Sequence, residues 1–142
     1  MRDATARRLS GLHTLIYRAT NGLVLRRLVN NDMLLLTTVG RHSGRPHTVP
    51  LLYLTDGPRL VVIASWGGRA ANPDWYRNLG ADPNAQVQVR GRRVAAVAST
   101  ATENERAEWW PRVVAAYDGY ATYQARTDRK IPVVFLDPTV LA

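Results

Sequence analysis

Residues 33–60 read MLLLTTVGRHSGRPHTVPLLYLTDGPRL, and this pattern of apolar runs and turns indicates the class of fold. The runs at 33–39 and 49–54 have the length and composition of strands. An Asp-Gly-Pro turn signal at 56–58 then precedes the next apolar run, at 60–64. Strands joined by such short turns pair antiparallel, because a parallel pair needs a crossover of helix length.

Three further apolar runs extend the predicted sheet. They lie at 85–89, 94–98 and 133–136, and Arg-Gly-Arg at 90–92 is a second tight-turn signal between the first two. The run at 85–89 alternates apolar and polar side chains, so this strand should have one wet face. About six strands without helix-length crossovers predict an α+β domain built on a small antiparallel barrel.

A helix is predicted late in the chain, before the last strand. Thr102 and Glu105 form a capping box, in which each side chain satisfies the other residue's backbone N–H. Apolar residues then continue at helical spacing: Ala107, Trp110, Val114 and Tyr117. We expect Pro111 to kink or split this helix and Gly119 to end it.

The first 31 residues form a separate basic segment in front of the predicted barrel, which spans 32–142. Apolar residues recur in it every three or four positions, as on one helix face: Leu9, Leu12, Ile16, Ala19 and Leu23. Six Arg and one Asp give residues 1–30 a charge of +5, out of +8 for the chain. A basic amphipathic helix can lie on an anionic membrane or cover the core of its own domain, and both interpretations stay open.

Composition excludes several classes of protein. The chain has 142 residues, of which 46% are hydrophobic and 21% charged, so it fits one compact domain and not a disordered chain. It has no Cys, and its three His have no metal-ligand spacing, so we expect no metal site. No catalytic triad or carboxylate pair can be assembled, so an enzyme of this kind would depend on a cofactor. No apolar run is long enough to span a membrane, and we expect a cytoplasmic protein.

The loop at 40–50, between the first two predicted strands, is the most informative segment for function. Its two Gly residues allow the backbone to approach a ligand closely, and Arg41 and Arg45 carry rigid guanidinium forks. Ser43 adds a short hydrogen-bond donor, so these residue types suit a phosphate. The loop is neither a Walker loop nor a Rossmann fingerprint, and the alternative is a solvated basic hairpin.

Two tryptophans offer a surface for a flat ligand. Ser65 and Trp66 follow a predicted strand, and Trp75 lies in the segment at 72–79. Either tryptophan could stack on a ring. However, Trp75 and Leu79 are at helical spacing, and we favour a short helix that plugs one end of the barrel.

Three tyrosines recur every three residues: Tyr117, Tyr120 and Tyr123. On a helix they would form an aromatic wall whose hydroxyls could bind a carbonyl or nitro oxygen. Packing of one or two of them in the core is an equal alternative.

Four motifs occur in order along the chain: LLLTTVGRHSGRP at 34–46, NPDWYRNL at 72–79, YDGYATY at 117–123 and RKIPVV at 129–134. Together they resemble the deazaflavin-dependent nitroreductase family of actinobacteria. The resemblance implies a split β-barrel, related to the flavin-mononucleotide-binding split barrels. It also implies the use of coenzyme F420, an 8-hydroxy-5-deazaflavin with a phosphate and an oligoglutamate tail.

The resemblance implies roles for individual residues. The phosphate end of F420 would be held by Arg41, His42, Ser43, Gly44, Arg45, His47 and Pro50. The ring system would be bordered by Ser65, Trp66, Trp75 and Asn78. The substrate-side tyrosines of the family match Tyr117, Tyr120 and Tyr123. Departures from the family pattern are His42 and His47, where Lys or Arg is common, and Trp66, where a smaller or cationic side chain often occurs.

The function implied is hydride transfer from the reduced deazaflavin to an electron-poor acceptor such as a quinone, nitroaromatic or enone. Tyr120 or Tyr123 would polarise the acceptor or relay a proton, with Tyr120 first because Gly119 gives its backbone latitude. From residue types alone the loop serves FMN equally well, so an FMN-binding split-barrel oxidoreductase is the alternative. A small basic nucleic-acid binder is a distant third, because most of the excess charge lies before the barrel.

Overall fold

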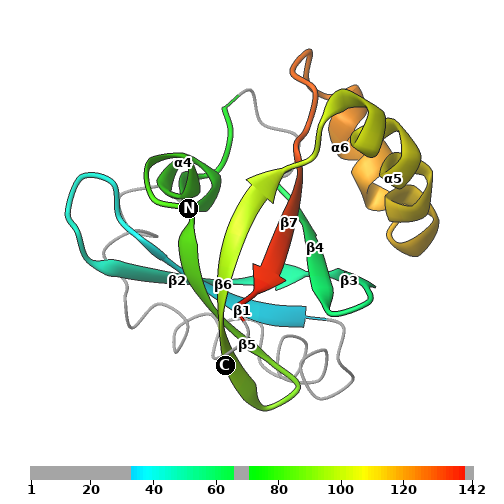
Figure 1. Ribbon diagram of the computed structural model, residues 1–142. Coiled ribbons are helices and arrows are strands. Elements are labelled where there is room, and N and C mark those ends of the chain that lie inside the picture. The colour runs from blue at the N-terminus through cyan, green and yellow to red at the C-terminus, as the bar shows by residue number, and fades with distance from the viewer. Residues whose placement is uncertain (1–32, 66–70, 140–142) are drawn as a thin grey trace, which may run out of the picture.

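The computed structural model describes residues 33–65 and 71–139, so the predicted N-terminal helix and Trp66 lie outside the described residues. Seven strands form one antiparallel sheet, which curls on itself (Figure 1). The strands are β1 (Met33–Val39), β2 (Pro46–Leu52), β3 (Leu54–Asp56), β4 (Arg59–Ile63), β5 (Asn84–Val89), β6 (Arg92–Thr100) and β7 (Val133–Pro138). Their order across the sheet is β2-β1-β5-β6-β7-β4-β3. The predicted antiparallel α+β fold is confirmed.

The sheet curls into a split barrel, and its two edge strands are consecutive in the chain. β2 and β3 lie at opposite edges of the strand order, yet only Tyr53 separates Leu52 from Leu54. One residue spans less than about 4 Å, so the two edges must lie close together, and β2 also contacts β4. The prediction of a single strand at 49–54 is wrong here, because the apolar run continues through a bend that its composition does not reveal.

Both predicted hairpins are present. β3 and β4 pair across Gly57, whose φ is +61°, and β5 and β6 pair across Arg90 and Gly91, with φ of +53° and +74°. Two consecutive residues with positive φ match the twist of the strands that they join. The predicted wet face of β5 is confirmed as well, since Val87 is buried and Gln86 is exposed.

The main core fills the inside of the curled sheet. Inward side chains of β1, β4, β5 and β7 meet there, among them Leu36, Val62 and Val87. Helix α4 (Asp74–Ala81) adds Trp75 and Leu79 to this core, and it lies beside the β1–β2 connection in Figure 1. The interpretation of Trp75 and Leu79 as a helix packed on the barrel is therefore confirmed.

A second core lies on the outer face of β4 and β7, under two helices. These are α5 (Glu103–Ala116) and α6 (Gly119–Ala125), at the right of Figure 1. Trp109 and Val113 of α5 pack against Phe135 of β7, and the rings of Trp109 and Phe135 meet edge to face. The predicted capping box of Thr102 and Glu105 is present in both directions.

Three details of the predicted helix are wrong. Its buried face contains Trp109 and Val113, one position away from the stripe that we predicted, and Ala107 is exposed. Pro111 does not split the helix, because it lies on the exposed face, where water can satisfy the carbonyl group that loses its partner. Gly119 begins α6 and does not end α5. Among residues 33–65 and 71–139, no helix is long and apolar enough to cross a membrane.

Candidate functional site

The loop between β1 and β2 closes on itself through backbone hydrogen bonds. Gly40 N donates to Arg45 O over 2.7 Å, and Gly44 N donates to Gly40 O over 2.8 Å. Gly44 has a φ of +70°, which a residue with a side chain adopts at a cost. Ser43 Oγ accepts from the N–H of Arg45 over 3.1 Å. The loop is therefore a defined turn and not a loose basic connection.

Gly40 makes room for two predicted cofactor residues. A Cβ atom at this position would lie 2.6 Å from both His47 Nε2 and Ser43 Oγ, closer than real Cβ contacts come. These two side chains themselves approach within 3.4 Å. A side chain at position 40 would therefore have to displace Ser43 and His47 from their present positions.

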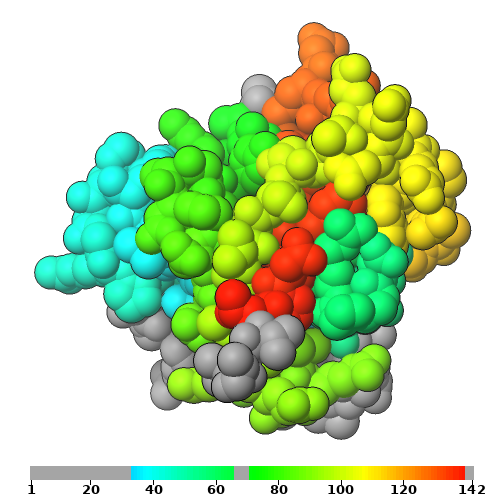
Figure 2. All heavy atoms as spheres, in the orientation of Figure 1, coloured from blue at the N-terminus to red at the C-terminus, as the bar shows by residue number. Residues whose placement is uncertain are grey.

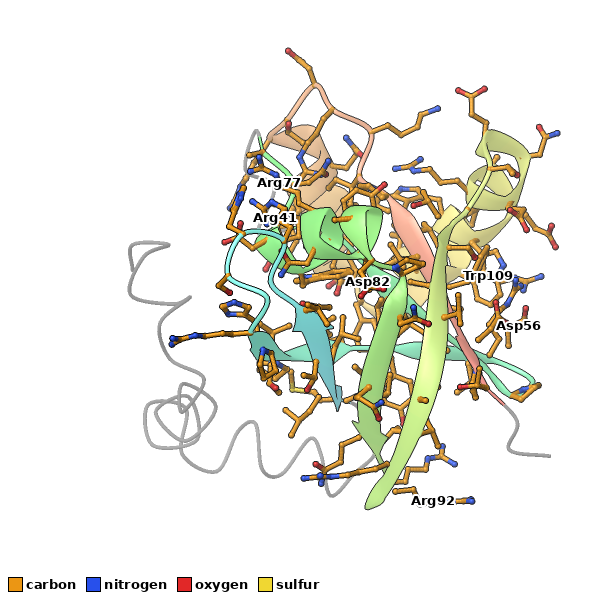
Figure 3. The ribbon with its side chains drawn as sticks, turned by 60° about the vertical axis from the view of Figure 1, so that its left-hand side comes forward. Arg41, Asp56, Arg77, Asp82, Arg92 and Trp109 are labelled. Atoms are coloured by element: carbon orange, nitrogen blue, oxygen red, sulfur yellow. The ribbon has the colours of Figure 1, made fainter. Side chains whose placement is uncertain are left out.

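The loop is fixed to α4 through Arg41 and Asn78. The backbone N–H of Arg41 donates to Asn78 Oδ1 over 3.2 Å, and its Nη1 donates to the same oxygen over 2.8 Å. Arg41 Nη2 pairs with Asp74 Oδ1 over 3.1 Å. Asn78, which is 3% exposed, also donates from its amide nitrogen to Thr38 Oγ1 over 3.1 Å. The Arg41 guanidinium thus faces α4, as Figure 3 shows, and holds the loop in place.

Several hydrogen-bond donors of the loop remain available to an anion. Within the part of the chain that the structure describes, the backbone N–H groups of His42 and Ser43 and the guanidinium of Arg45 have no protein acceptor. All three residues are exposed. Arg77, an exposed residue of α4, lies on the same side as Arg41 in Figure 3 and adds positive charge. Successive free N–H groups next to a guanidinium fit the oxygens of a phosphate.

The loop and α4 form one continuous surface, in cyan and green in Figure 2. Ser65 is 7% exposed and follows β4, and Pro50 is half-buried in β2. Trp75 is 7% exposed and meets Tyr76 edge to face, so its ring belongs largely to the core. Trp75 therefore supports the site from the core and offers little free ring surface for stacking.

The three tyrosines form a connected cluster at the junction of α5 and α6. The ring centroids of Tyr117 and Tyr120 lie 6.2 Å apart and those of Tyr120 and Tyr123 lie 5.9 Å apart, both edge to face. Tyr120 is buried at 8% exposure, and the other two are half-buried. Tyr117 Oη donates to the carbonyl of Tyr53 over 3.3 Å, which ties the cluster to the β2–β3 bend. Tyr120 packs in the second core, and Tyr117 and Tyr123 pack against it, so the alternative of core packing is confirmed. The substrate-side role of the three tyrosines stays a prediction.

Arg129 is a residue that sequence reasoning missed, although it stands in the motif at 129–134. Its Nη1 donates to Ala64 O over 3.1 Å and to Asn72 Oδ1 over 2.7 Å, and its Nη2 donates to Ser65 O over 2.6 Å. Burial lowers the pKa of this guanidinium from its ordinary value. A lone Arg before Lys-Ile-Pro gives no signal of its partners, because they lie 57 to 65 positions away.

A hollow of about 310 Å³ lies elsewhere, on the outer face of β1, β2, β5 and β6. None of its lining residues is a predicted site residue, and they are Leu35, Thr37, Thr48, Gln86, Val87, Gln88 and Arg93. Most of the side chains around this hollow are polar. The available N–H groups and the guanidinium of Arg45 lie instead at the loop, next to α4. We therefore assign the candidate site to the loop, α4 and the β4 end, with the tyrosine cluster as a second group.

Comparisons with known proteins point to one family. Residues 9–138 match the family model for F420H2-dependent quinone reductase. A curated protein of Mycobacterium tuberculosis, named as an F420H2-dependent quinone reductase, is 37% identical over 130 residues, which cover 88% of this chain and 87% of that protein. A second protein of the same species is 44% identical over 105 residues, covering 74% of this chain and 88% of its own length, and its name assigns it provisionally to the same activity.

A solved structure supports the same relationship. It is described as an F420-H2 dependent reductase, and it superposes with a TM-score of 0.69 at 36% identity. The match covers 75% of this chain and 94% of that chain. The split-barrel fold implied by the sequence motifs is confirmed.

Proposed function

Because the chain belongs to the F420H2-dependent quinone reductase family, we propose that it reduces a quinone with reducing equivalents from F420H2. The family assignment implied by the four sequence motifs is confirmed, and with it the expected cofactor. Within the site, the observation that carries the proposal is the closed loop at 40–45, which presents unused N–H groups beside an exposed Arg45. Nitroaromatics and enones are further acceptors that the same electron-poor chemistry predicts.

The loop residues fit the phosphate end of F420. We assign the phosphate to the N–H groups of His42 and Ser43 and to Arg45, with Gly44 allowing close approach of the backbone. His47, next to Ser43, adds a donor when its ring nitrogen carries a proton. Arg41 contributes by fixing the loop to α4, since its guanidinium is already occupied there. These neutral and singly charged donors match the anionic oxygens of a phosphate better than an uncharged ligand.

The ring end of F420 is assigned to the residues between the loop and the tyrosine cluster. Ser65 and Asn78 supply buried polar atoms there, and Pro50 supplies an apolar face. Trp75 supports this group from the core. Trp66, which lies outside the described residues, stays a predicted neighbour of the ring.

F420H2 supplies a hydride when it is bound, and the protein supplies position and a proton. A carbonyl oxygen of the quinone needs a hydrogen-bond donor as it gains charge, and tyrosine hydroxyls are suitable donors. Tyr120 holds the centre of the cluster through two edge-to-face contacts, and Tyr123 is half-buried beside it. Packing of this cluster excludes water from one side of the acceptor, which strengthens each polar contact.

A cofactor titration tests the proposal. F420 fluorescence should be quenched by the protein at micromolar concentration, and FMN should bind more weakly. Arg45→Ala should weaken F420 binding about tenfold, because a charge-assisted hydrogen bond is lost. Arg112→Ala removes an exposed arginine of α5 and serves as the control, with binding unchanged. Tighter binding of FMN than of F420, or an F420 affinity that Arg45→Ala leaves unchanged, would contradict the proposal.

The location in the cell follows from the acceptor in this proposal. We expect a cytoplasmic protein that contacts the inner face of the membrane through the basic segment at 1–31, where a lipid-soluble quinone would be found. Partition of the full chain into anionic liposomes should fall when residues 1–30 are deleted. Equal partition of both proteins would remove the membrane part of the proposal and leave the reductase part standing.

A further inference from the structure

Arg129 connects the two groups of the candidate site. Its side chain binds the end of β4 and the segment before α4, through Ala64, Ser65 and Asn72. Its own carbonyl oxygen accepts from Gln124 Nε2 of α6 over 2.8 Å. Gln124 directly follows Tyr123 in the chain. One residue therefore contacts both the cofactor side and the tyrosine helix.

Gln124 is itself fully engaged. Its Oε1 accepts from Ile131 N and from Arg106 Nη2, each over 2.9 Å, and its Nε2 donates to the carbonyls of Arg129 and Thr127. Arg106 also donates from Nε to Ile131 O over 2.8 Å, and burial lowers its pKa from the ordinary value. An amide with all four hydrogen-bonding positions in use has one orientation, so α6 and the segment at 129–131 are held together rigidly.

We propose that Arg129 is a positioning residue for the reaction, which sets the place of Ser65 relative to the tyrosine cluster. This inference rests on the proposed function. Arginine suits the task because its planar fork can bind several acceptors in fixed directions, whereas lysine presents a single point of charge. Hydride transfer depends steeply on the distance between donor and acceptor, so a rigid tie between the two sides of the site would act directly on the rate.

A structural role alone and a positioning role differ in what a substitution changes. Loss of a structural contact lowers the stability but leaves the folded fraction with normal affinity. Loss of a positioning contact changes cofactor affinity and turnover in protein that is still folded. The matched control is Lys130→Met, because Lys130 is the adjacent cation, is 61% exposed and, among the described residues, pairs only with Glu103, at 3.8 Å.

The experiment compares Arg129→Met, Arg129→Lys and Lys130→Met in the full chain. Circular dichroism establishes that each variant is folded, and fluorescence titration gives its Kd for F420. We expect Arg129→Met to raise this Kd about tenfold, the usual effect of losing a residue that orients a binding group. Arg129→Lys should recover part of the affinity, and Lys130→Met should match the wild type. In kinetics with a quinone, kcat should fall more than KM rises for both Arg129 variants.

Hydrogen exchange of the cofactor-free protein gives a readout that does not depend on F420. Arg129→Met should speed amide exchange at residues 60–65 and 74–79, and Lys130→Met should not. Folded Arg129 variants with wild-type Kd, kcat and exchange would overturn the inference, even if their melting temperature falls. Failure of the wild-type chain to bind F420 would instead contradict the proposed function, and exchange alone would then decide whether Arg129 holds the two sides together.

If Arg129→Met does not fold, Asn72→Ala replaces it. This variant removes one acceptor of the guanidinium and leaves Ala64 and Ser65 bound. We expect a smaller rise in Kd, of about threefold, with the fold intact. An unchanged Kd in this variant would count against the positioning role.

Discussion

At the scale of single residues, Gly40 lies in a crowded position and Gly80 in an open one, so alanine should have opposite effects on stability at the two sites. Gly40→Ala should lower the free energy of unfolding by about 1–3 kcal/mol, because its Cβ would collide with His47 and Ser43 at 2.6 Å. It should also weaken F420 binding, since both displaced side chains belong to the proposed phosphate site. Fluorescence titration and urea denaturation measure the two effects.

The control for this prediction is Gly80→Ala. Gly80 is an exposed residue of α4, and a Cβ there would meet nothing within 4 Å. Alanine favours helix over glycine, so this variant should be more stable by up to about 1 kcal/mol, with unchanged F420 binding. Equal stability of the two variants would show that the space around Gly40 is not limiting.

Tyr120 gives the second prediction at this scale. Tyr120→Phe should lower kcat for quinone reduction by about a hundredfold, because it removes the hydroxyl that we propose as a donor to the acceptor and keeps the ring that packs against Tyr117 and Tyr123. Tyr76→Phe is the matched control, since it removes a hydroxyl that lies within hydrogen-bond distance of Thr100 Oγ1, at 3.1 Å. Wild-type turnover of Tyr120→Phe on every acceptor tested would move the role to another residue, with Tyr123→Phe as the next variant to measure.

At the scale of secondary-structure elements, the contact between the loop and α4 depends on Asn78. Asn78→Ala removes the acceptor of two Arg41 donors and the donor to Thr38, all in a buried setting. We expect the free energy of unfolding to fall by about 2–3 kcal/mol in the absence of cofactor. Asn84→Ala, which removes one exposed side-chain donor to Asp82, should cost less than about 0.5 kcal/mol. Urea denaturation that gives the same value for both would contradict the anchoring role.

Sequence patterns predicted the elements well where the determinants are local. Apolar runs bounded by turn signals gave the strands, Gly57 and Gly91 marked the two hairpins, and Thr102 with Glu105 marked the start of α5. Each of these depends on residues within a few positions of one another.

The sequence patterns did not show features that depend on contacts between residues far apart in the chain. The side of α5 that is buried depends on Phe135 and its neighbours on β7, so the helix pattern alone placed the stripe one position away. The sequence also gave no sign that Arg41 contacts Asp74 and Asn78, which lie 33 and 37 positions further along the chain, and its role toward the cofactor stays a prediction. The roles of the site residues stay predictions, drawn from residue types at the loop and from the family resemblance elsewhere.

At the scale of the whole molecule, the net charge of +8 should act on the rate of cofactor association. F420 carries a phosphate and carboxylates, so a basic protein attracts it. At physiological ionic strength, salt screens this attraction beyond about 8 Å. Raising the ionic strength from low to physiological values should lower the association rate constant about tenfold and leave the dissociation rate constant nearly unchanged. Stopped-flow fluorescence measures both, and a deazaflavin lacking phosphate and tail is the control. An association rate that ignores salt would show that charge does not guide the encounter.

The join at Tyr53 bears on how this scaffold can be altered. Side chains alternate between the two faces of a strand. One residue added between Leu52 and Leu54 would therefore exchange the inward and outward side chains of β2 or β3. A foreign peptide grafted at the tip marked by Gly57 would only lengthen a hairpin, whose ends are already held by β3 and β4. A binding sequence or a reporter should therefore be inserted at the tip of the β3–β4 hairpin, and the connection between β2 and β3 should keep its length.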